Sequence, residues 1–274
     1  MADADANKAW VVLRAIITGL LVGMIAANVW PILLLKIGMP LAAAAEALFL
    51  ALYVWWVRGG GPPRSWKAAR AANFRVRTLS GGDWAWGAIA AVAIATSVHA
   101  AIVVLFRLVP FPAEAFHQGY DLSFIPTTPL KLLACVVSAA SAGICEETGF
   151  RGYMQVPIER RMGALPAILV SSFFFMLLHL TKSWALIGMV PIVFGAGLLY
   201  GALAWASRSL VFGMIGHTLM DIGLFAYWWA QVLGTFTQRP ISETGIDQSF
   251  TIECAVLGIA LLVAASTIAV LRRR

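Results

Sequence analysis

SAASAGICEETGFRGY, residues 138–153, places two adjacent glutamates, Glu146 and Glu147, and an arginine, Arg151, within an apolar helical stretch. An ionised side chain at the centre of a membrane helix costs about 2.5–3.5 kcal/mol on insertion scales. Charged residues in such a position therefore face the interior of a helix bundle and are candidates for a functional site. The stretch predicts a membrane bundle with a polar site inside it.

The composition of the whole chain points to the same class. Of the 274 residues, 61% are hydrophobic and 12% are charged, whereas soluble domains have about 45–50% and about 25%. Eleven tryptophans fit a membrane protein, because indole rings anchor at the interface between lipid and water. The net charge of +7 comes from loops and tails, where it sets the topology. We therefore expect no binding of nucleic acid.

Eight apolar runs are long enough to be interpreted as transmembrane helices. They cover roughly residues 10–35, 39–57, 84–109, 129–157, 164–181, 184–206, 210–233 and 251–271. The sequence thus predicts an all-α polytopic membrane helix bundle that forms a single transmembrane domain over residues 1–274. The fifth run is short and a tight turn, Thr181-Lys182-Ser183, follows it, so these two helices could form a hairpin that does not fully span.

The basic residues indicate one orientation. The loop Arg58–Asp83 carries six of them, and the positive-inside rule places this loop in the cytoplasm. Eight spans then put both termini in the cytoplasm, in an inner or plasma membrane. We expect a short amphipathic helix in this loop, lying on the membrane surface with its basic side chains attracted to anionic lipid. The first apolar run is too long for a signal peptide and is interpreted as an uncleaved anchor.

The fourth run contains the charged cluster. Glu147 and Arg151 are four residues apart in the favourable order for an ion pair on one helix face. Glu146 points about 100° away around the helix, which leaves its carboxylate available for acid–base chemistry. The alternative is that all three side chains form a packing network between helices. Gly149 and Gly152 flank Arg151, so the helix is expected to loosen there and open a path for water, unless they are ordinary tolerated glycines.

Two further helices carry polar residues that complete a candidate site. His179 ends the fifth run, and His217 and Asp221 share a face of the seventh because they are four residues apart. A lone histidine in an apolar helix is more often a hydrogen-bonded core residue, but this joint occurrence favours a functional site. In a straight bundle Glu146 and the two histidines lie at different depths, so tilted or kinked helices are needed to bring them together.

Other polar residues have simpler interpretations. Glu46 and His99 each stand alone on a helix, and we expect an interhelical hydrogen bond for each. Arg14 and Arg107 lie nearer the helix ends, from which their side chains can extend to the interface. The odd number of cysteines implies no disulfide framework, and we expect all three to be buried: Cys135, Cys145 and Cys254.

Three motifs together resemble the CAAX protease and bacteriocin-processing (CPBP) family of intramembrane proteases, which includes the endoproteases that trim prenylated CAAX proteins. The pattern of that family is EExxxR, then FxxxH, then HxxxN or HxxxD. In this chain it reads Glu146-Glu147-x-x-x-Arg151, Phe175-x-x-x-His179 and His217-x-x-x-Asp221. The resemblance covers about residues 129–233, which we expect to form the protease core.

The resemblance implies a role for each position. Glu146, with His179, would activate a water for attack on the peptide carbonyl, and His217 and Asp221 would steady the oxyanion. Glu147 and Arg151 would be supporting residues that fix the helix. Asp221 departs from the CAAX-cleaving members, which usually have asparagine there. An ionised aspartate cannot donate a hydrogen bond, so Asp221 must be protonated or must orient His217.

A metal ion is an alternative for the same residues. Two histidines and two carboxylates are an acceptable ligand set for zinc or another divalent ion: Glu146, His179, His217 and Asp221. The family was long described as metalloproteases but includes metal-independent members, and the chain has no HExxH motif. We therefore favour a metal-free, glutamate-dependent mechanism and expect no cofactor.

The leading expectation is an intramembrane endopeptidase. It would act on a peptide or protein with a membrane-associated or lipidated segment, in contact with membrane lipid. One alternative is a non-catalytic scaffold or immunity protein on the same fold. Another is a proton-coupled transporter, which the lack of an internal repeat disfavours. A cysteine protease acting through Cys145 is a further alternative, but no sequence feature marks a reactive thiolate there.

Overall fold

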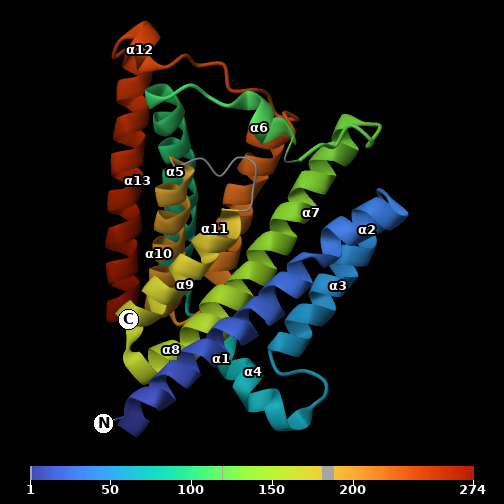
Figure 1. Ribbon diagram of the computed structural model, residues 1–274, viewed down its shortest axis with the longest axis vertical. Coiled ribbons are helices and arrows are strands. Elements are labelled where there is room, and N and C mark those ends of the chain that lie inside the picture. The colour runs from blue at the N-terminus through green and yellow to red at the C-terminus, as the bar shows by residue number, and fades with distance from the viewer. Residues whose placement is uncertain (1, 119, 181–187) are drawn as a thin grey trace.

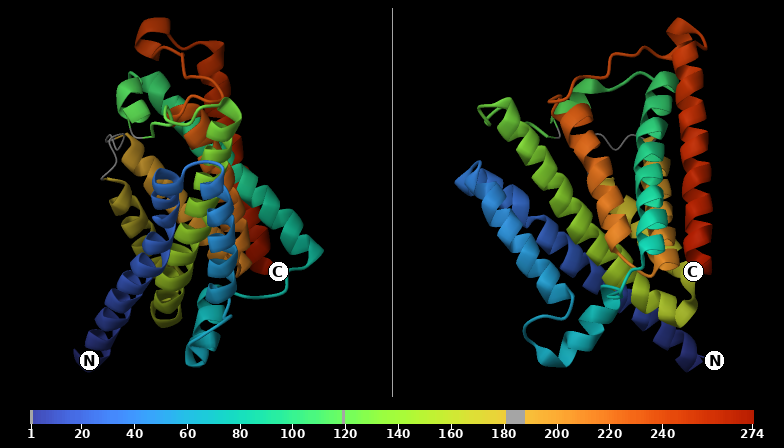
Figure 2. Two further views of the ribbon diagram at one scale, coloured as in Figure 1. Left: turned by 90° about the vertical axis from the view of Figure 1, so that its right-hand side faces the viewer. Right: turned by 180° about the vertical axis from the view of Figure 1, so that it is seen from behind.

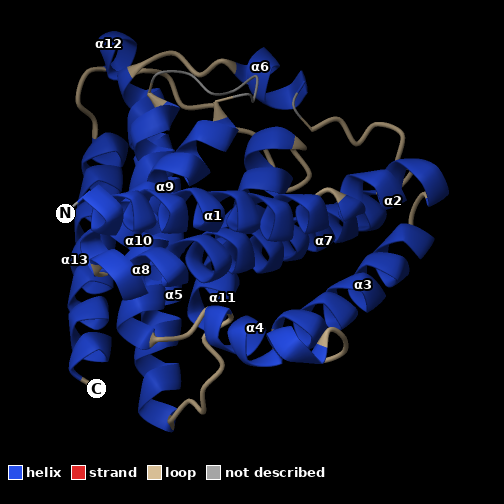
Figure 3. Ribbon diagram, turned by 60° about the horizontal axis from the view of Figure 1, so that its bottom comes forward, coloured by secondary structure: helices blue, strands red, loops and turns tan. Residues whose placement is uncertain are grey.

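The computed structural model describes residues 2–118, 120–180 and 188–274, and every regular element in these ranges is a helix (Figure 3). The long α-helices are α1 (Ala2–Ala27), α2 (Val29–Ile37), α3 (Leu41–Val57), α5 (Gly81–Leu108), α7 (Thr128–Glu147), α8 (Gln155–Met162), α9 (Ala164–His179), α10 (Met189–Ser207), α11 (Val211–Gly223) and α13 (Gln248–Arg273). The short ones are α4 (Lys67–Asn73), α6 (Ala113–Gln118) and α12 (Ile241–Thr244), with a 3₁₀ turn at Arg64–Trp66 and two π-helices, η2 (Thr148–Met154) and η3 (Leu224–Trp229).

The predicted class, an all-α polytopic membrane bundle, is confirmed. Within the described ranges, five helical runs are long and apolar enough to cross a membrane: Asn7–Ile37, Gly81–Leu108, Thr128–Met162, Met189–Ser207 and Gln248–Arg273. Of the remaining predicted spans, α3 and α9 are shorter apolar helices, and α11 continued by η3 is helical but is not among these five runs. The predicted turn Thr181-Lys182-Ser183 and the start of the run 184–206 lie outside the described residues.

The outer surface of the bundle is apolar, as a lipid-facing surface must be. Large side chains such as Ile25 on α1, Leu52 on α3 and Leu262 on α13 are more than half exposed. Small and aromatic side chains are buried where helices meet, such as Ala90, Ala93 and Phe106 of α5 in the largest core cluster.

The helices form two differently inclined groups. α5 and α13 run side by side and nearly upright, whereas α1 and α7 cross the molecule obliquely (Figures 1 and 2). α11 packs between α5 and α7 and joins the two groups. Both termini lie at one end together with α4 and α8, and α6 and α12 lie at the opposite end (Figure 1). The expected short helix in the loop Arg58–Asp83 is α4.

The charged stretch of α7 leads into the π-helix η2. A π-helix places one extra residue in a turn and is frequent at functional sites. At this point α1 crosses so closely that a methyl group on Gly149 would lie 2.7 Å from the carbonyl oxygen of Gly19 and 2.7 Å from the Cα of Gly23. The helix does change its winding at Gly149, but contact with the α1 backbone fills the space in which we expected a path for water.

Two isolated polar residues have the expected partners. The hydroxyl group of Ser141 donates to Oε1 of Glu46 at 2.8 Å, which ties α3 to α7. The Nε2 atom of His99 lies 2.9 Å from the carbonyl oxygen of Met220, which ties α5 to α11. The prediction of interhelical hydrogen bonds is therefore confirmed for both.

The expectation for Arg107 is wrong. This side chain is only 2% exposed and does not extend to the interface. It donates to Gln238, Thr244 and Asp247, which lie in the segment between η3 and α13. That segment passes over the end of α5 and supplies acceptors 131–140 residues away in the chain, so local sequence could not reveal them.

The expectation for the cysteines is wrong at one position. Cys135 and Cys145 are buried as predicted, but Cys254 is exposed. α13 packs against α5 and α10, and its remaining surface faces outward with side chains such as Ile252 and Leu262. An apolar run alone does not distinguish the packed face from the lipid-facing one.

Candidate active site

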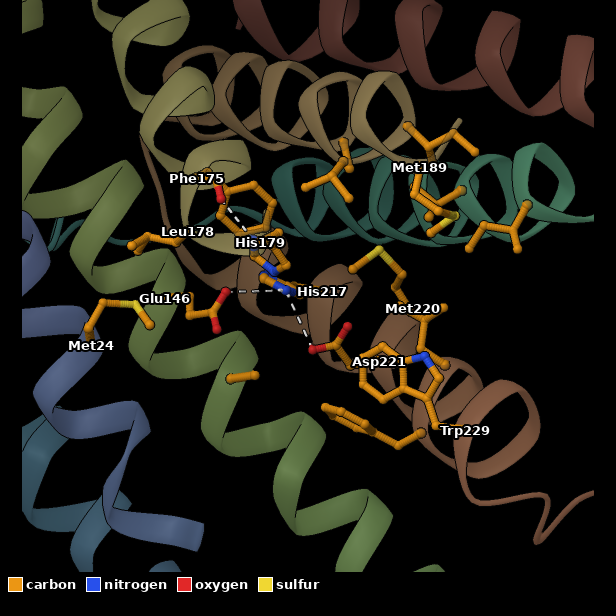
Figure 4. A pocket seen from close by; sticks show the side chains of 18 residues that line it. Met24, Glu146, Phe175, Leu178, His179, Met189, His217, Met220, Asp221 and Trp229 are labelled. Carbon is orange, nitrogen blue, oxygen red and sulfur yellow. Dashed lines mark hydrogen bonds and ion pairs between the residues drawn. The ribbon is translucent and has the colours of Figure 1, made fainter. Parts of the chain in front are cut away.

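Three helices bring the four candidate residues to one cavity of about 270 Å³. Glu146 comes from the end of α7, His179 from the last residue of α9, and His217 and Asp221 from α11 (Figure 4). Apolar side chains make up most of the remaining wall, among them Met24, Met189, Leu224 and Trp229. The cavity therefore has a small polar patch in an otherwise apolar lining.

The difference in depth expected for a straight bundle is removed by inclination and helix length. α7 crosses the bundle obliquely and α9 ends at His179 (Figure 1). The end of α9 consequently reaches the level of Glu146, and the π-helix η2 shifts the chain after it.

Glu147 is the anchor of the polar patch. Its Oε1 atom lies 3.0 Å from Nη1 of Arg151, and both side chains are completely buried. The same oxygen lies 3.0 Å from Nδ1 of His217. Gly213 on α11 makes this approach possible, because a methyl group there would lie 2.7 Å from Oε2 of Glu147. Glu147 therefore fixes Arg151 within its own helix and His217 across to α11.

The second nitrogen of His217 faces the cavity. Its Nε2 atom lies 3.5 Å from Oδ2 of Asp221 and 4.0 Å from Oε2 of Glu146, and Figure 4 draws both contacts. A carboxylate can only accept, so the bond to Glu147 requires a proton on Nδ1. His217 then presents Nε2 to the cavity, as an acceptor when neutral and as a donor when protonated.

His179 is oriented by its own helix. The Nδ1 atom of His179 donates to the carbonyl oxygen of Phe175 at 2.7 Å, because a carbonyl can only accept. In the neutral ring, Nε2 is then the acceptor. The FxxxH spacing has a direct structural meaning here: it is the i, i+4 spacing that sets the tautomer of the histidine.

Aromatic rings enclose the patch. Phe175 lies with its ring centroid 4.6 Å from that of His179 and 5.8 Å from that of His217. The guanidinium carbon of Arg151 lies 4.5 Å from the centroid of Phe175, a cation–π contact. Phe175 thus links the second motif to the other two.

Comparison with known proteins agrees with this geometry. Residues 126–223 match the family described as type II CAAX prenyl endopeptidase Rce1-like. The expected family is confirmed over this segment. No curated protein and no solved structure matches the chain.

The Rce1-like segment begins two residues before α7 and ends with the last residue of α11, so it contains all three motifs and the whole polar patch. The match supports a CAAX-type intramembrane protease in general, and a substrate that is prenylated or otherwise associated with the membrane. α1, α5 and α13 lie outside the matched segment, although α1 and α5 supply cavity side chains such as Met24, Val98 and Ile102.

Sequence reasoning missed Tyr200 within the Rce1-like segment. Its fully buried ring stacks on His217, with centroids 5.5 Å apart and planes inclined by 12°. The hydroxyl group contacts the sulfur of Met220 at 3.9 Å. Tyr200 lies three residues after Gly197 and directly before Gly201, and this pair of glycines four residues apart, which lets helices approach closely, was the available signal.

The same side chains bear on whether the site holds a metal ion. In the described ranges, no group of three or more His, Cys, Asp or Glu side chains is arranged to hold a metal ion. Glu147 occupies Nδ1 of His217, and the nearest carboxylate oxygens of Asp221 and Glu146 lie 3.5 and 4.0 Å from its Nε2. The choice between a metal-free site and a metal site therefore stays a prediction.

Proposed function

We propose that the protein is an intramembrane endopeptidase in which Glu146 and His179 activate water for hydrolysis of a peptide bond. The observation that carries this proposal is the presence of Glu146, His179, His217 and Asp221 in one cavity of a segment that matches a protease family. The basic loop Arg58–Asp83 favours a cytoplasmic position for both termini in an inner or plasma membrane.

In the proposed first step, a water lies between Glu146 and His179. Glu146 takes a proton from the water, and the hydroxide attacks the carbonyl carbon of the scissile bond. The Nε2 atom of His179 orients the water by accepting a hydrogen bond from its second O–H group, because the Nδ1 atom already donates to the carbonyl oxygen of Phe175. Glu146 then delivers its proton to the leaving amine nitrogen as the C–N bond breaks.

His217 is proposed as the oxyanion donor. When protonated, it donates Nδ1–H to Glu147 and directs Nε2–H into the cavity, toward the oxygen that becomes negative. Asp221, at 3.5 Å from Nε2, is positioned to orient and stabilise this cation. Of the two roles open to Asp221, we therefore favour the orientation of His217 over direct donation from a protonated carboxyl group.

No step of this proposal passes through a metal ion. Glu146 is the base, His179 accepts a hydrogen bond from the water, and His217 donates a hydrogen bond to the oxyanion. We accordingly expect cleavage to continue when a strong chelator of divalent ions is added to the membranes. Loss of cleavage in chelator, with recovery on addition of zinc, would contradict this part of the proposal.

The experiment that tests the function is cleavage of a prenylated CAAX peptide, and of total membrane proteins, by the purified chain in lipid vesicles. Glu146→Gln keeps the size of the side chain but cannot take the proton, so the rate is expected to fall by about 10²–10⁴-fold. Glu243→Gln is the matched control, because Glu243 is an exposed carboxylate in α12, at the opposite end of the molecule from the termini. Equal rates for the Glu146→Gln variant and the wild type would exclude the mechanism and favour a non-catalytic protein on the same fold.

A further inference from the structure

A second cavity, of about 460 Å³, lies between α1, α3, α4 and the start of α8. Its size falls within the range of about 300–1,000 Å³ that is typical of ligand pockets. It shares no lining residue with the candidate active site. Since α4 lies at the end of the molecule that carries both termini (Figure 1), this cavity is at one membrane surface.

The cavity has a cationic end. Arg70 on α4 lines it and is only 2% exposed. Its guanidinium donates through Nη1 to the carbonyl oxygens of Pro62 and Pro63 and through Nη2 to those of Gly60, at 2.7 Å, and Gly61, at 2.9 Å. Its Nε atom is buried without a hydrogen-bond partner, and the guanidinium lies over the ring of Trp56 at 4.7 Å. Arg14 of α1 lines the same cavity. Within the described part of the chain, neither arginine forms an ion pair with a carboxylate.

A buried hydroxyl group adds an independent indication of a ligand. Tyr153 lines the cavity from η2, is 6% exposed, and its Oη atom has no hydrogen-bond partner in the described structure. A buried hydroxyl group without a hydrogen-bond partner is unfavourable because it has lost its bonds to water, so such a group indicates a bonding partner that is not part of the protein.

The other end of the cavity is an apolar track. Val11, Ala15, Thr18 and Val22 line it at spacings of three and four residues, which is one face of α1 over about 16 Å. The hydroxyl group of Thr18 is occupied by the carbonyl oxygen of Arg14. The track begins about one turn before Arg14, at Val11, passes it, and continues to Val22 within the span Asn7–Ile37, as an acyl chain would.

We propose that this cavity binds one anionic glycerophospholipid. Its phosphate pairs with the charge of Arg14 and accepts hydrogen bonds from the Nε–H group of Arg70 and the Tyr153 hydroxyl, and one acyl chain lies along α1. Binding there fastens the basic loop to η2, the π-helix that follows Glu146 and Glu147. The site is separate from the proposed peptidase chemistry and does not depend on it.

The test measures lipid retention by the full chain in mild detergent with native mass spectrometry. Phosphatidylglycerol and phosphatidylcholine with identical acyl chains are titrated, and free glycerol phosphate is titrated separately. We expect one phosphatidylglycerol per protein, bound at least about tenfold more tightly than the other two. The choline cation of phosphatidylcholine cancels the charge of its phosphate and is repelled by the two arginines, and glycerol phosphate has no acyl chain to bury. If both lipids bind with equal affinity, the site does not select a negative charge and the proposal is wrong. If glycerol phosphate binds as tightly as phosphatidylglycerol, the ligand is a free phosphate and not a lipid.

Two variants test the residues. Tyr153→Phe and Arg14→Gln are each expected to weaken retention of phosphatidylglycerol by about tenfold. Arg273→Gln is the matched control, an exposed arginine at the same end that does not line the cavity, and is expected to retain the lipid as the wild type does. Without lipid, Tyr153→Phe is expected to unfold at or above the wild-type temperature, because it removes an unsatisfied hydroxyl. Undiminished binding by Tyr153→Phe, or equal weakening by Arg14→Gln and Arg273→Gln, overturns the site.

Discussion

Glu146 and Glu147 are neighbours in the chain but have different surroundings. Glu147 is fully buried and its Oε1 atom contacts both Arg151 and His217, whereas the Glu146 side chain is 14% exposed and lines the cavity. A single step of about 100° around the helix produces this difference. The first carboxylate can exchange a proton with a bound molecule, and the second holds the guanidinium of Arg151 and the imidazole of His217 in place.

This difference predicts that only one of the two glutamates is needed for stability. Glu147→Gln leaves the guanidinium of Arg151 buried without a counter-charge, so we expect it to lower the free energy of unfolding by about 3–5 kcal/mol. Glu146→Gln is the matched control and is expected to leave stability nearly unchanged. Thermal unfolding of the purified chain in detergent measures both. Equal unfolding temperatures for the two variants would contradict the assignment of Glu147 as the structural carboxylate.

At the scale of elements, the close crossing of α1 over η2 determines where the charged cluster lies. The contact is made by backbone atoms of Gly19, Gly23 and Gly149, which side-chain rearrangement cannot relieve. Gly149→Ala is therefore expected to destabilise the protein by about 1–3 kcal/mol and to reduce cleavage, because it displaces η2 from α1.

Gly258→Ala is the control for that substitution. Gly258 lies inside α13, and a methyl group added there meets no atom within 4 Å. Alanine is favoured over glycine in a helix interior by about 0.5–1 kcal/mol, so this variant is expected to be as stable as the wild type or slightly more so. Denaturant unfolding of both variants in the same detergent separates the packing effect from the general effect of losing a glycine.

Local patterns predicted the helices and the Glu147–Arg151 pair, because both depend on residues within one or two turns. They also predicted an interhelical hydrogen bond for Glu46 and for His99, but not which residue is the partner. Local patterns could not predict contacts between residues far apart in the chain. Two examples are the partners of Arg107 in the segment before α13 and the stacking of Tyr200 on His217. The meeting of His179 with Glu146 depends on how far α7 inclines, and helix inclination leaves no periodic signal in the sequence.

At the scale of the whole molecule, Arg107 fastens the segment before α13 to the end of α5. Asp247 both accepts from Arg107 at 2.7 Å and caps α13 through the N–H of Phe250 at 2.8 Å. The hydrogen bond from Arg107 holds the pKa of Asp247 below its ordinary value of 3.8.

The pH dependence follows from the direction of this shift. A carboxylate whose pKa is lower in the folded state stabilises the fold above its ordinary pKa, and this contribution is lost as the pH falls through the folded value. We expect the unfolding temperature of the wild type to drop as the pH is lowered below about 4. Asp247→Asn should be less stable than the wild type at pH 7 and should show a smaller drop in acid. An identical acid profile for the variant would contradict this role.

The helical run Thr128–Met162 contains 35 residues, which corresponds to a length of about 50 Å at about 1.5 Å per residue. The hydrocarbon core of a bilayer is about 30 Å thick, so the run fits only because it is inclined (Figure 1). A thicker bilayer favours a steeper helix and a thinner one a flatter helix. Because Glu146 lies near the middle of this run and His179 on a different helix, bilayer thickness adjusts the distance between the two. Cleavage should therefore have an optimum acyl-chain length, and the lipid itself becomes a regulator of the enzyme.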